Sequence, residues 1–271
     1  MIRTTFAIVT LAAATQGAAQ ITVLSWNVES GGNDPAVIAR QLVELGRADI
    51  YCLQEVGTRN IGRYGAAVRE THGKGYRYAP SVTGRGDRLQ IIYNSDRFEL
   101  IEIRELFKHG EHRLNDWRHR SPLLLELEER TTKAVFGVMT VHLARGNREI
   151  RLEQATGLRQ WANARSRPVI AVGDFNFDFD YQAGRGNQAF VAFTSDGSPW
   201  RWVRPPEDVD TNWSDRDGDG RDNYPDSCLD FAFVSGVRNA TARVIVRDGD
   251  FPDDDRTSDH RPIMATIDGI E

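Results

Sequence analysis

The sequence predicts a single α/β domain, built as a sandwich of β-sheets flanked by helices. Short apolar runs with strand-like composition recur along the chain, and amphipathic stretches lie between some of them. No internal repeat or low-complexity linker divides these elements. Because each strand and helix needs a partner that covers its apolar face, we expect them to share one core.

The predicted strands are apolar runs of the length that is typical for strands in globular proteins. They cover residues 21–26, 50–54, 89–93, 123–127, 134–141, 169–172, 229–234, 242–246 and 263–267.

Two segments have the spacing of an amphipathic helix. Asp34 and Pro35 supply an N-cap and a proline at the first helical position, and Gly46 supplies a stop. Residues 147–165 predict a second helix. The apolar faces of the two helices are formed by Val37, Ile38, Leu42 and Leu45, and by Ile150, Leu158 and Trp161.

The N-terminus, residues 1–19, has the pattern of a secretory signal peptide. Arg3 gives a positive charge, a short apolar run follows, and residues 17–19 are small, as a cleavage site requires. The alternative is a buried N-terminal strand or helix. The run is too short to span a bilayer, so we expect the mature chain, residues 20–271, to be one secreted or periplasmic domain without stable membrane insertion.

Charge and cysteine content limit the partners and the covalent structure. A formal net charge of −5 excludes the global basic field of a nonspecific nucleic-acid binder, so a phosphate-bearing partner needs a local site. Cys52 and Cys228 would meet an oxidising compartment, where a disulfide and two buried thiols both remain open. No feature indicates a protein partner, and we expect a monomer.

Several polar side chains interrupt the apolar pattern at or near the ends of predicted strands. Each alone has an ordinary explanation as a turn former, a helix cap or a satisfied histidine. Together in one setting they predict a shared cleft, because strand ends can direct side chains to a common place. They are Asn27, Glu55, His142, Asp174, Asn176, Asp230, Asp259 and His260.

These positions belong to short motifs whose order and separation resemble a known superfamily. The motifs are LSWNVE, LQEV, VHL, GDFN, LDFAFV and SDHRPI, within residues 21–267. They resemble the endonuclease/exonuclease/phosphatase superfamily, the fold of pancreatic deoxyribonuclease, neutral sphingomyelinases and inositol polyphosphate 5-phosphatases. The resemblance implies a four-layered α/β sandwich, with two packed mixed β-sheets flanked by helices and a divalent metal in a cleft at one edge.

The resemblance also implies a metal-dependent phosphoric ester hydrolase. Hydrolysis of a phosphodiester needs a cation on the non-bridging oxygens, a group that takes a proton from water and a group that assists the leaving oxygen. The family pattern makes Glu55 the principal ligand of Mg²⁺ or Mn²⁺, with Asn27 and Asp259 beside it. Carboxylate and amide oxygens are the ligands that hard cations prefer.

Acid–base and phosphate contacts follow from the same resemblance. It places His260 beside the scissile phosphate, oriented by Asp230. Asp174 and Asn176 position the attacking water and a phosphate oxygen, and Asn27 also contacts the phosphate. Whether Asp174 or His260 removes the proton stays open.

Two further positions match the deoxyribonuclease branch. Asp87 stands where that branch has an acid paired to the first catalytic histidine, here His142, and Arg120 stands where it has a phosphate-binding arginine. Gly57 replaces the arginine that this branch uses for minor-groove contact, which weakens that kind of DNA recognition. Arg120 ends a basic stretch that is either a phosphate-binding surface or a solvated loop: Lys108, His109, His112, Arg113, Arg118 and His119.

An acidic segment at residues 215–226 resembles the Ca²⁺ loop of an EF-hand, although no helix–loop–helix surrounds it. Its like charges would repel one another unless a cation neutralised them, and the alternative is an unliganded acidic loop. The candidate ligand positions are Asp215, Asp217, Asp219, Arg221, Asn223 and Asp226.

We therefore expect a secreted, divalent-metal-dependent phosphodiesterase that hydrolyses DNA or RNA with low sequence specificity. One alternative is a lipid or sugar phosphodiesterase or phosphatase, such as a sphingomyelinase or an inositol-phosphate phosphatase, which an exposed aromatic hairpin at residues 199–202 would favour. Another is a non-catalytic Ca²⁺-binding adhesion module, but such a module would gain nothing from keeping the whole polar set.

Overall fold

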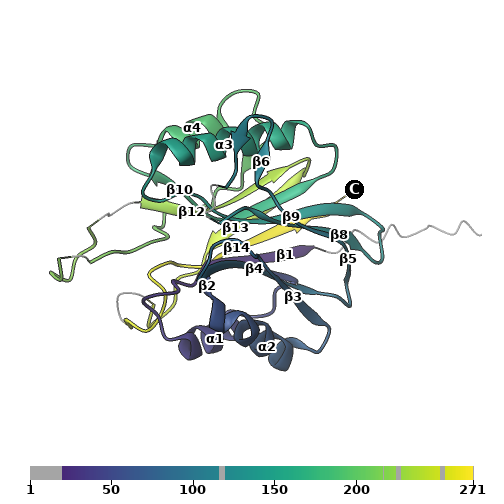
Figure 1. Cartoon of the computed structure of the whole chain (residues 1–271). Helices are drawn as coiled ribbons and strands as arrows, with labels where there is room; N and C mark the ends of the chain where they lie inside the picture. Colours follow the sequence, from purple (N-terminus) through teal and green to yellow (C-terminus); the bar gives the residue numbers. More distant parts are fainter. Residues whose placement is uncertain (1–19, 116–119, 216, 224–226, 251–253, 271) are drawn as a thin grey trace, which may run out of the picture.

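Two six-stranded mixed β-sheets form the centre of the protein (Figure 1). The computed structural model describes residues 20–115, 120–215, 217–223, 227–250 and 254–270. The proposed signal peptide, Arg118, His119 and Asp226 lie outside the described residues.

The first sheet contains the N-terminal strands and the last two strands of the chain. Its central strands β1 and β2 are parallel, and all its other neighbours are antiparallel. Its order is β13 (Asn239–Val244), β14 (Ile263–Asp268), β1 (Ile21–Asn27), β2 (Ile50–Gly57), β4 (Asp87–Asn94) and β3 (Tyr76–Pro80).

The second sheet repeats this plan with the strands from the middle of the chain. Strands β9 and β10 are parallel at its centre, and the remaining pairs are antiparallel. Its order is β11 (Arg201–Trp202), β12 (Ser227–Ser235), β10 (Val169–Asp180), β9 (Val135–His142), β8 (Leu123–Glu129) and β5 (Phe98–Glu105).

Helices cover the outer faces of both sheets, which gives four layers (Figure 1). Helices α1 (Pro35–Glu44) and α2 (Ile61–His72) pack on the first sheet, with a 3₁₀ turn at Thr58–Asn60 before α2. Helices α3 (Arg148–Asn163) and α4 (Gln188–Thr194) pack on the second. A short hairpin of β6 (Lys108–His109) and β7 (His112–Arg113) lies against α3.

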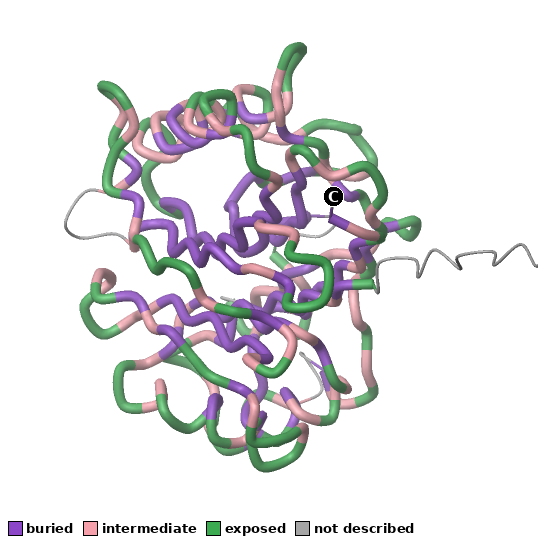
Figure 2. Tube along the Cα trace, turned by 90° about the vertical axis from the view of Figure 1, so that its right-hand side faces the viewer, coloured by how far each residue is buried: buried purple, intermediate pink, exposed green. Residues whose placement is uncertain are grey.

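Three apolar clusters hold the four layers together. One fills the space between the sheets, and the other two lie between each sheet and its helices. In Figure 2 the buried segments form the interior and the exposed segments the outer loops. Cys52 belongs to the cluster between the sheets and Cys228 to the cluster beneath α3 and α4, and both are buried free thiols, so the disulfide alternative is excluded.

The structure confirms the predicted sandwich, every predicted strand and both predicted helices. The prediction for β10 was too short. This strand continues through Phe175, Phe177 and Phe179, which alternate with polar residues and are buried in the cluster beneath α3 and α4. Among the described residues, no helix is long and apolar enough to cross a membrane.

Candidate active site

The inner faces of the central strands change from apolar to polar toward their carboxyl ends. Alternation along each strand directs every second side chain into the space between the sheets. On β9 the inward residues run Val138, Thr140, His142, and on β10 they run Ile170, Val172, Asp174. On β1 the same stripe ends at Asn27. Because these strands are parallel within each sheet, the polar ends meet at one edge of the sandwich.

A β-bulge directs Glu55 to this edge. Leu53 and Val56 pair with Gln90 and Arg88, so two residues of β2 oppose one residue of β4. Glu55 takes a positive φ of 55°, a region that disfavours residues with a Cβ. Strain of this kind persists where the surrounding structure imposes it, and it is common at functional sites.

Asn27 connects the two sheets at the site. Its Nδ2 lies 3.3 Å from Oε1 of Glu55, on its own sheet, and 3.1 Å from Oδ2 of Asp174, on the other sheet. The same nitrogen lies 3.5 Å from Nε2 of His260. The Oδ1 of Asn27 accepts a hydrogen bond from the backbone N–H of Glu29 at 3.1 Å.

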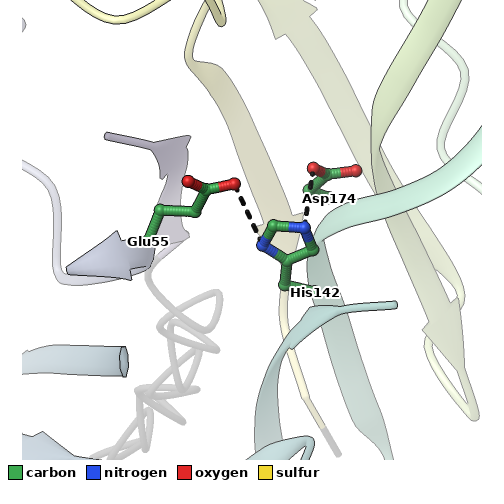
Figure 3. A group of neighbouring side chains, drawn as sticks. All are labelled: Glu55, His142 and Asp174. Atoms are coloured by element: carbon green, nitrogen blue, oxygen red, sulfur yellow. Dashed lines mark ion pairs between the residues drawn. The ribbon is translucent and has the colours of Figure 1, made fainter. Parts of the chain in front are cut away.

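Glu55, His142 and Asp174 form a compact group of possible metal ligands (Figure 3). Oε1 of Glu55 lies 3.5 Å from Nδ1 of His142, and Oδ2 of Asp174 lies 3.4 Å from Nε2 of the same ring. One ligand atom from each residue lies within 4.8 Å of the others. The resemblance implied a ligand role for Glu55, whereas it implied that His142 is a catalytic histidine and that Asp174 positions the attacking water.

Asp259, a predicted metal ligand, lies at the rim of this group. Its Oδ1 is 3.8 Å from Nε2 of His260 and has no hydrogen-bond partner among the described residues, although that oxygen is buried. A buried carboxylate oxygen without a partner is costly, and a cation removes that cost. The donor set of this edge therefore fits a divalent metal.

His260 is held by hydrogen bonds of its ring and of its backbone. Its Nδ1 lies 2.7 Å from Oδ2 of Asp230, and both side chains are buried. The backbone N–H of His260 donates to Oγ of Ser258 at 3.0 Å, and its carbonyl accepts from Nε1 of Trp26 at 2.8 Å. Burial by itself lowers the pKa of His260, but the carboxylates of Asp230 and Asp259 outweigh burial, and the pKa lies well above its ordinary value.

The carboxyl groups at this edge have raised pKa values because several negative charges share a buried space. Burial raises the pKa of Asp174 to about 7, although the nearby His260 opposes the shift. Burial, and then the Asp87 carboxylate, raise the pKa of Glu55. A bound cation would favour the ionised form of both groups.

Arg120 lies between Asp87 and His142. Its Nη2 is 3.1 Å from Nε2 of His142, and its Nη1 forms an ion pair with Asp87. The other oxygen of Asp87 accepts from Oγ of Ser30 at 3.0 Å. The resemblance placed Asp87 next to the histidine, whereas this structure pairs Asp87 with the arginine that reaches His142.

Asn176 is buried in the irregular part of β10. It has a positive φ of 51°, and its backbone N–H donates to Oδ1 of Asp174 at 2.9 Å. Its side-chain Nδ2 donates to the carbonyl of Leu143 at 3.1 Å. Asn176 therefore connects the Asp174 carboxylate to the loop that follows β9.

Glu29 is a site residue that sequence reasoning missed. Its Oε2 accepts from the backbone N–H of Asp259 at 3.1 Å. Burial, and then the charge of Asp259, raise the pKa of Glu29 to about 7. Its place as the last residue of the LSWNVE motif was the available signal.

Most of the described part of the basic stretch packs away from the active site. In the β6–β7 hairpin, Nε2 of His112 lies 3.0 Å from Nε2 of Gln160 on α3. The backbone N–H of Arg113 donates to Glu153 of the same helix at 2.9 Å. Among the described residues of the stretch, Arg120 is the one whose side chain contacts the catalytic groups.

The acidic segment gathers three carboxylates. Ligand atoms of Asp215, Asp217 and Asp219 lie within 4.8 Å of one another. Backbone N–H groups occupy part of this set, since Asp219 and Gly220 donate to Asp215 at 3.0 Å. Arg221 donates its N–H to Asp219 at 2.9 Å, and Asn223 donates its amide to Asp217 at 3.2 Å. Calcium binding by this loop stays a prediction.

The aromatic segment at residues 199–202 is not an exposed hairpin. Trp200 is buried and stacks on Phe193 with ring centroids 5.2 Å apart. Trp202 packs on Phe179 with centroids 4.8 Å apart. The feature that would have favoured a lipid substrate is therefore part of the core.

Comparisons with known proteins agree with this architecture. Residues 24–260 match the Endonuclease/Exonuclease/phosphatase family. No curated protein sequence matches the chain.

Among solved structures, an endonuclease/exonuclease/phosphatase family protein from Bacteroides thetaiotaomicron is 21% identical, with a TM-score of 0.67 over 93% of this chain and 99% of that chain. Mannosyl-6-phosphatase Bt3783 from B. thetaiotaomicron VPI-5482 is 21% identical, with a TM-score of 0.65 over 91% and 99%. D. rerio TDP2, complexed with a single-strand DNA product, is 18% identical, with a TM-score of 0.67 over 93% and 100%. The chain belongs to the endonuclease/exonuclease/phosphatase family and is a metal-dependent hydrolase of phosphoric esters.

Proposed function

We propose that this protein is a divalent-metal-dependent nuclease that hydrolyses phosphodiester bonds of DNA or RNA with low sequence specificity. The observation that carries the proposal is the placement of two buried histidines around one carboxylate. Nε2 of His142 lies 3.4 Å, and Nε2 of His260 lies 4.0 Å, from Oδ2 of Asp174. A diester needs both a proton acceptor for water and a proton donor for the leaving alkoxide, and this arrangement offers both.

Glu55 is the principal proposed ligand for Mg²⁺ or Mn²⁺, with Asn27 and Asp259 beside it. His142 and Asp174 offer further ligand atoms close to Glu55. When bound, the cation supplies the positive charge that neutralises the non-bridging oxygens of the phosphate.

The remaining roles follow from charge and position. The raised pKa of His260 favours the imidazolium, which suits the donation of a proton to the leaving oxygen. Asp174, whose pKa of about 7 lies near neutrality in the metal-free protein, suits the removal of a proton from water. Asp230 orients His260, while Arg120, Asn27 and Asn176 hold phosphate oxygens. Contacts of this kind go to the backbone of a nucleic acid and carry no sequence information.

A substrate panel on purified protein tests the proposal. Plasmid DNA, RNA, bis-p-nitrophenyl phosphate, sphingomyelin, inositol phosphates and mannose 6-phosphate are each incubated with Mg²⁺, Mn²⁺ or Ca²⁺. We expect cleavage of the nucleic acids and of the synthetic diester. Turnover of sphingomyelin or of the monoesters without cleavage of nucleic acid would overturn the proposal. Glu55→Gln, prepared in parallel, controls for a contaminating nuclease.

Export is part of the same proposal and rests on residues 1–19. N-terminal sequencing of protein recovered outside the cytoplasm should begin near Gln20. An intact N-terminus on protein that stays in the cytoplasm would contradict export without touching the proposed chemistry.

A further inference from the structure

A polar pocket of about 280 Å³ adjoins the catalytic residues. Asn176 lines this pocket and donates its backbone N–H to the Asp174 carboxylate. Asn212 also lines the pocket and pairs with His260 in an isolated antiparallel bridge. The pocket is therefore contiguous with the place where the scissile phosphate would lie.

Two arginines give the pocket its charge. Arg151, near the start of α3, donates through Nη1 to the carbonyls of Ala144 and Arg145, both at 2.7 Å. These bonds hold its guanidinium in place, while its buried Nε has no hydrogen-bond partner among the described residues. The exposed side chain of Arg145 forms no hydrogen bond or ion pair within the described part of the chain. One guanidinium is thus fixed and the other is free to close on a ligand.

The other lining groups are polar. Asp178 is the one acidic side chain in the part of the lining that the structure describes, and its Oδ1 already accepts from Oγ of Ser227 at 2.9 Å. Asn212 is 6% exposed, and its Oδ1 has no hydrogen-bond partner among the described residues. Among the described residues of the lining there is no aromatic ring on which a base would stack. An anionic, hydroxyl-bearing group fits this lining better than a base does.

We propose that this pocket is a subsite for a second phosphate of the substrate, one linkage away from the phosphate that is cleaved. The inference rests on the proposed function and adds a substrate class: esters that carry another phosphate next to the scissile one are preferred over isolated diesters. Paired guanidinium groups bind phosphate oxygens through charge-assisted hydrogen bonds. Arg145 and Arg151 would form that pair, and Asn212 would meet a sugar hydroxyl.

Dinucleotides that differ only in a terminal phosphate test the proposal. The substrates are thymidylyl-thymidine without a terminal phosphate, with a 5′-phosphate and with a 3′-phosphate. The measurement is kcat/KM for each with Mg²⁺. We expect one of the two phosphorylated substrates to be cleaved about tenfold or more faster than the unphosphorylated one, because charge-assisted bonds from the two guanidinium groups to a phosphate are strong.

Two variants identify the arginine. The ratio of kcat/KM for the preferred phosphorylated dinucleotide to kcat/KM for the unphosphorylated one reports the subsite. Arg145→Ala should reduce this ratio toward one, and Arg145→Lys should restore part of it. Arg148→Ala is the matched control, since Arg148 lies three residues further on, carries the same charge and is not part of this lining. Equal losses of the ratio in the Arg145 and Arg148 variants would show a general charge effect and overturn the subsite.

The outcome separates the two proposals. Ratios near one for both phosphorylated dinucleotides, with the unphosphorylated dinucleotide still cleaved, would overturn the subsite and leave the nuclease intact. Absence of cleavage for all three dinucleotides, for plasmid DNA and for RNA would overturn the proposed function itself.

Discussion

Asp230 and His260 meet across the boundary between the two sheets. Asp230 lies on β12 of one sheet, and His260 lies three residues before the start of β14 of the other. A distance of 2.7 Å separates Oδ2 of the acid from Nδ1 of the ring. Asp230 therefore fixes the orientation of the imidazole. Burial lowers the pKa of His260, but the Asp230 carboxylate helps to raise this pKa above its ordinary value.

Asp230→Asn should remove this electrostatic support while it keeps the shape of the side chain. We expect kcat to fall by about a hundredfold or more, as for other carboxylate–histidine pairs. If His260 is the general acid, the alkaline limb of the pH profile of kcat/KM should also move to lower pH. An unchanged profile in this variant would contradict the role of the pair.

Replacement of either catalytic histidine should abolish most of the activity. His142→Ala and His260→Ala should each lose about two to four decades of rate, because His260 is proposed to donate a proton to the leaving oxygen and His142 to offer a ligand atom beside Glu55. His112→Ala is the control, since His112 contacts Gln160 on α3. Turnover close to wild type in a folded variant, verified by circular dichroism, would remove that histidine from the mechanism.

Glu55 should dominate metal affinity. Glu55→Gln keeps the volume but removes the charge, so we expect a higher Mg²⁺ requirement together with lower turnover. In the wild type, EDTA should abolish activity and excess Mg²⁺ should restore it. Glu44→Gln, an exposed position on α1, serves as the matched control. Calorimetric titration measures the affinity, and full activity after exhaustive chelation would refute a metal mechanism.

The metal-free protein should lose stability at this edge as pH rises. Because the folded pKa of Asp174 is raised to about 7, the folded state binds more protons than the unfolded state between about pH 4 and about pH 7. The contribution of Asp174 to the free energy of unfolding is therefore fully present below about pH 4 and is lost as pH rises through about 7.

Asp174→Asn isolates this contribution. With both proteins in EDTA, the Tm of the variant relative to the Tm of the wild type should rise as pH rises across that window. Saturating Mg²⁺ should reduce the shift, because the cation stabilises the ionised carboxylate. A Tm difference that does not depend on pH would show that Asp174 does not titrate there.

Calcium should act on the acidic loop separately from the active site. If Asp215, Asp217 and Asp219 bind Ca²⁺, the ion should raise Tm even where Mg²⁺ supplies the chemistry. A Ca²⁺ concentration a hundredfold above Kd adds about 2.7 kcal/mol to the free energy of unfolding. Asp217→Asn combined with Asp219→Asn should abolish this Ca²⁺-dependent shift and change the Mg²⁺ dependence of turnover less. A shift that survives the double substitution would contradict the prediction.

The sequence predicted elements whose local signals agree with the fold. Strands of the sheet centres are short apolar runs, and α1 and α3 have capping residues at their N-termini. Helix α2 was missed because only Tyr64, Gly65 and Val68 of its residues are buried, so its apolar stripe is narrow. Strand β5 was missed because it lies at a sheet edge, where charged residues alternate with half-exposed Ile101 and Ile103.

The residues of the candidate site were accessible from motifs, but their contacts were not. Arg120 reaches both Asp87 and His142 only because β4 and β9 lie in sheets that pack face to face. The contact between Glu29 and the Asp259 backbone joins residues far apart in the chain. Such contacts depend on how the sheets dock, and spacing along one strand carries no information about that geometry.

The position of the active site between the two sheets makes catalysis depend on their docking. Asn27 and Glu55 come from one sheet, whereas His142 and Asp174 come from the other. Neither sheet alone assembles the set, so the site forms only when the sheets dock. A cation bound by residues of both sheets would stabilise the docked state, and we expect it to slow unfolding, because it adds interactions that the separated sheets lack.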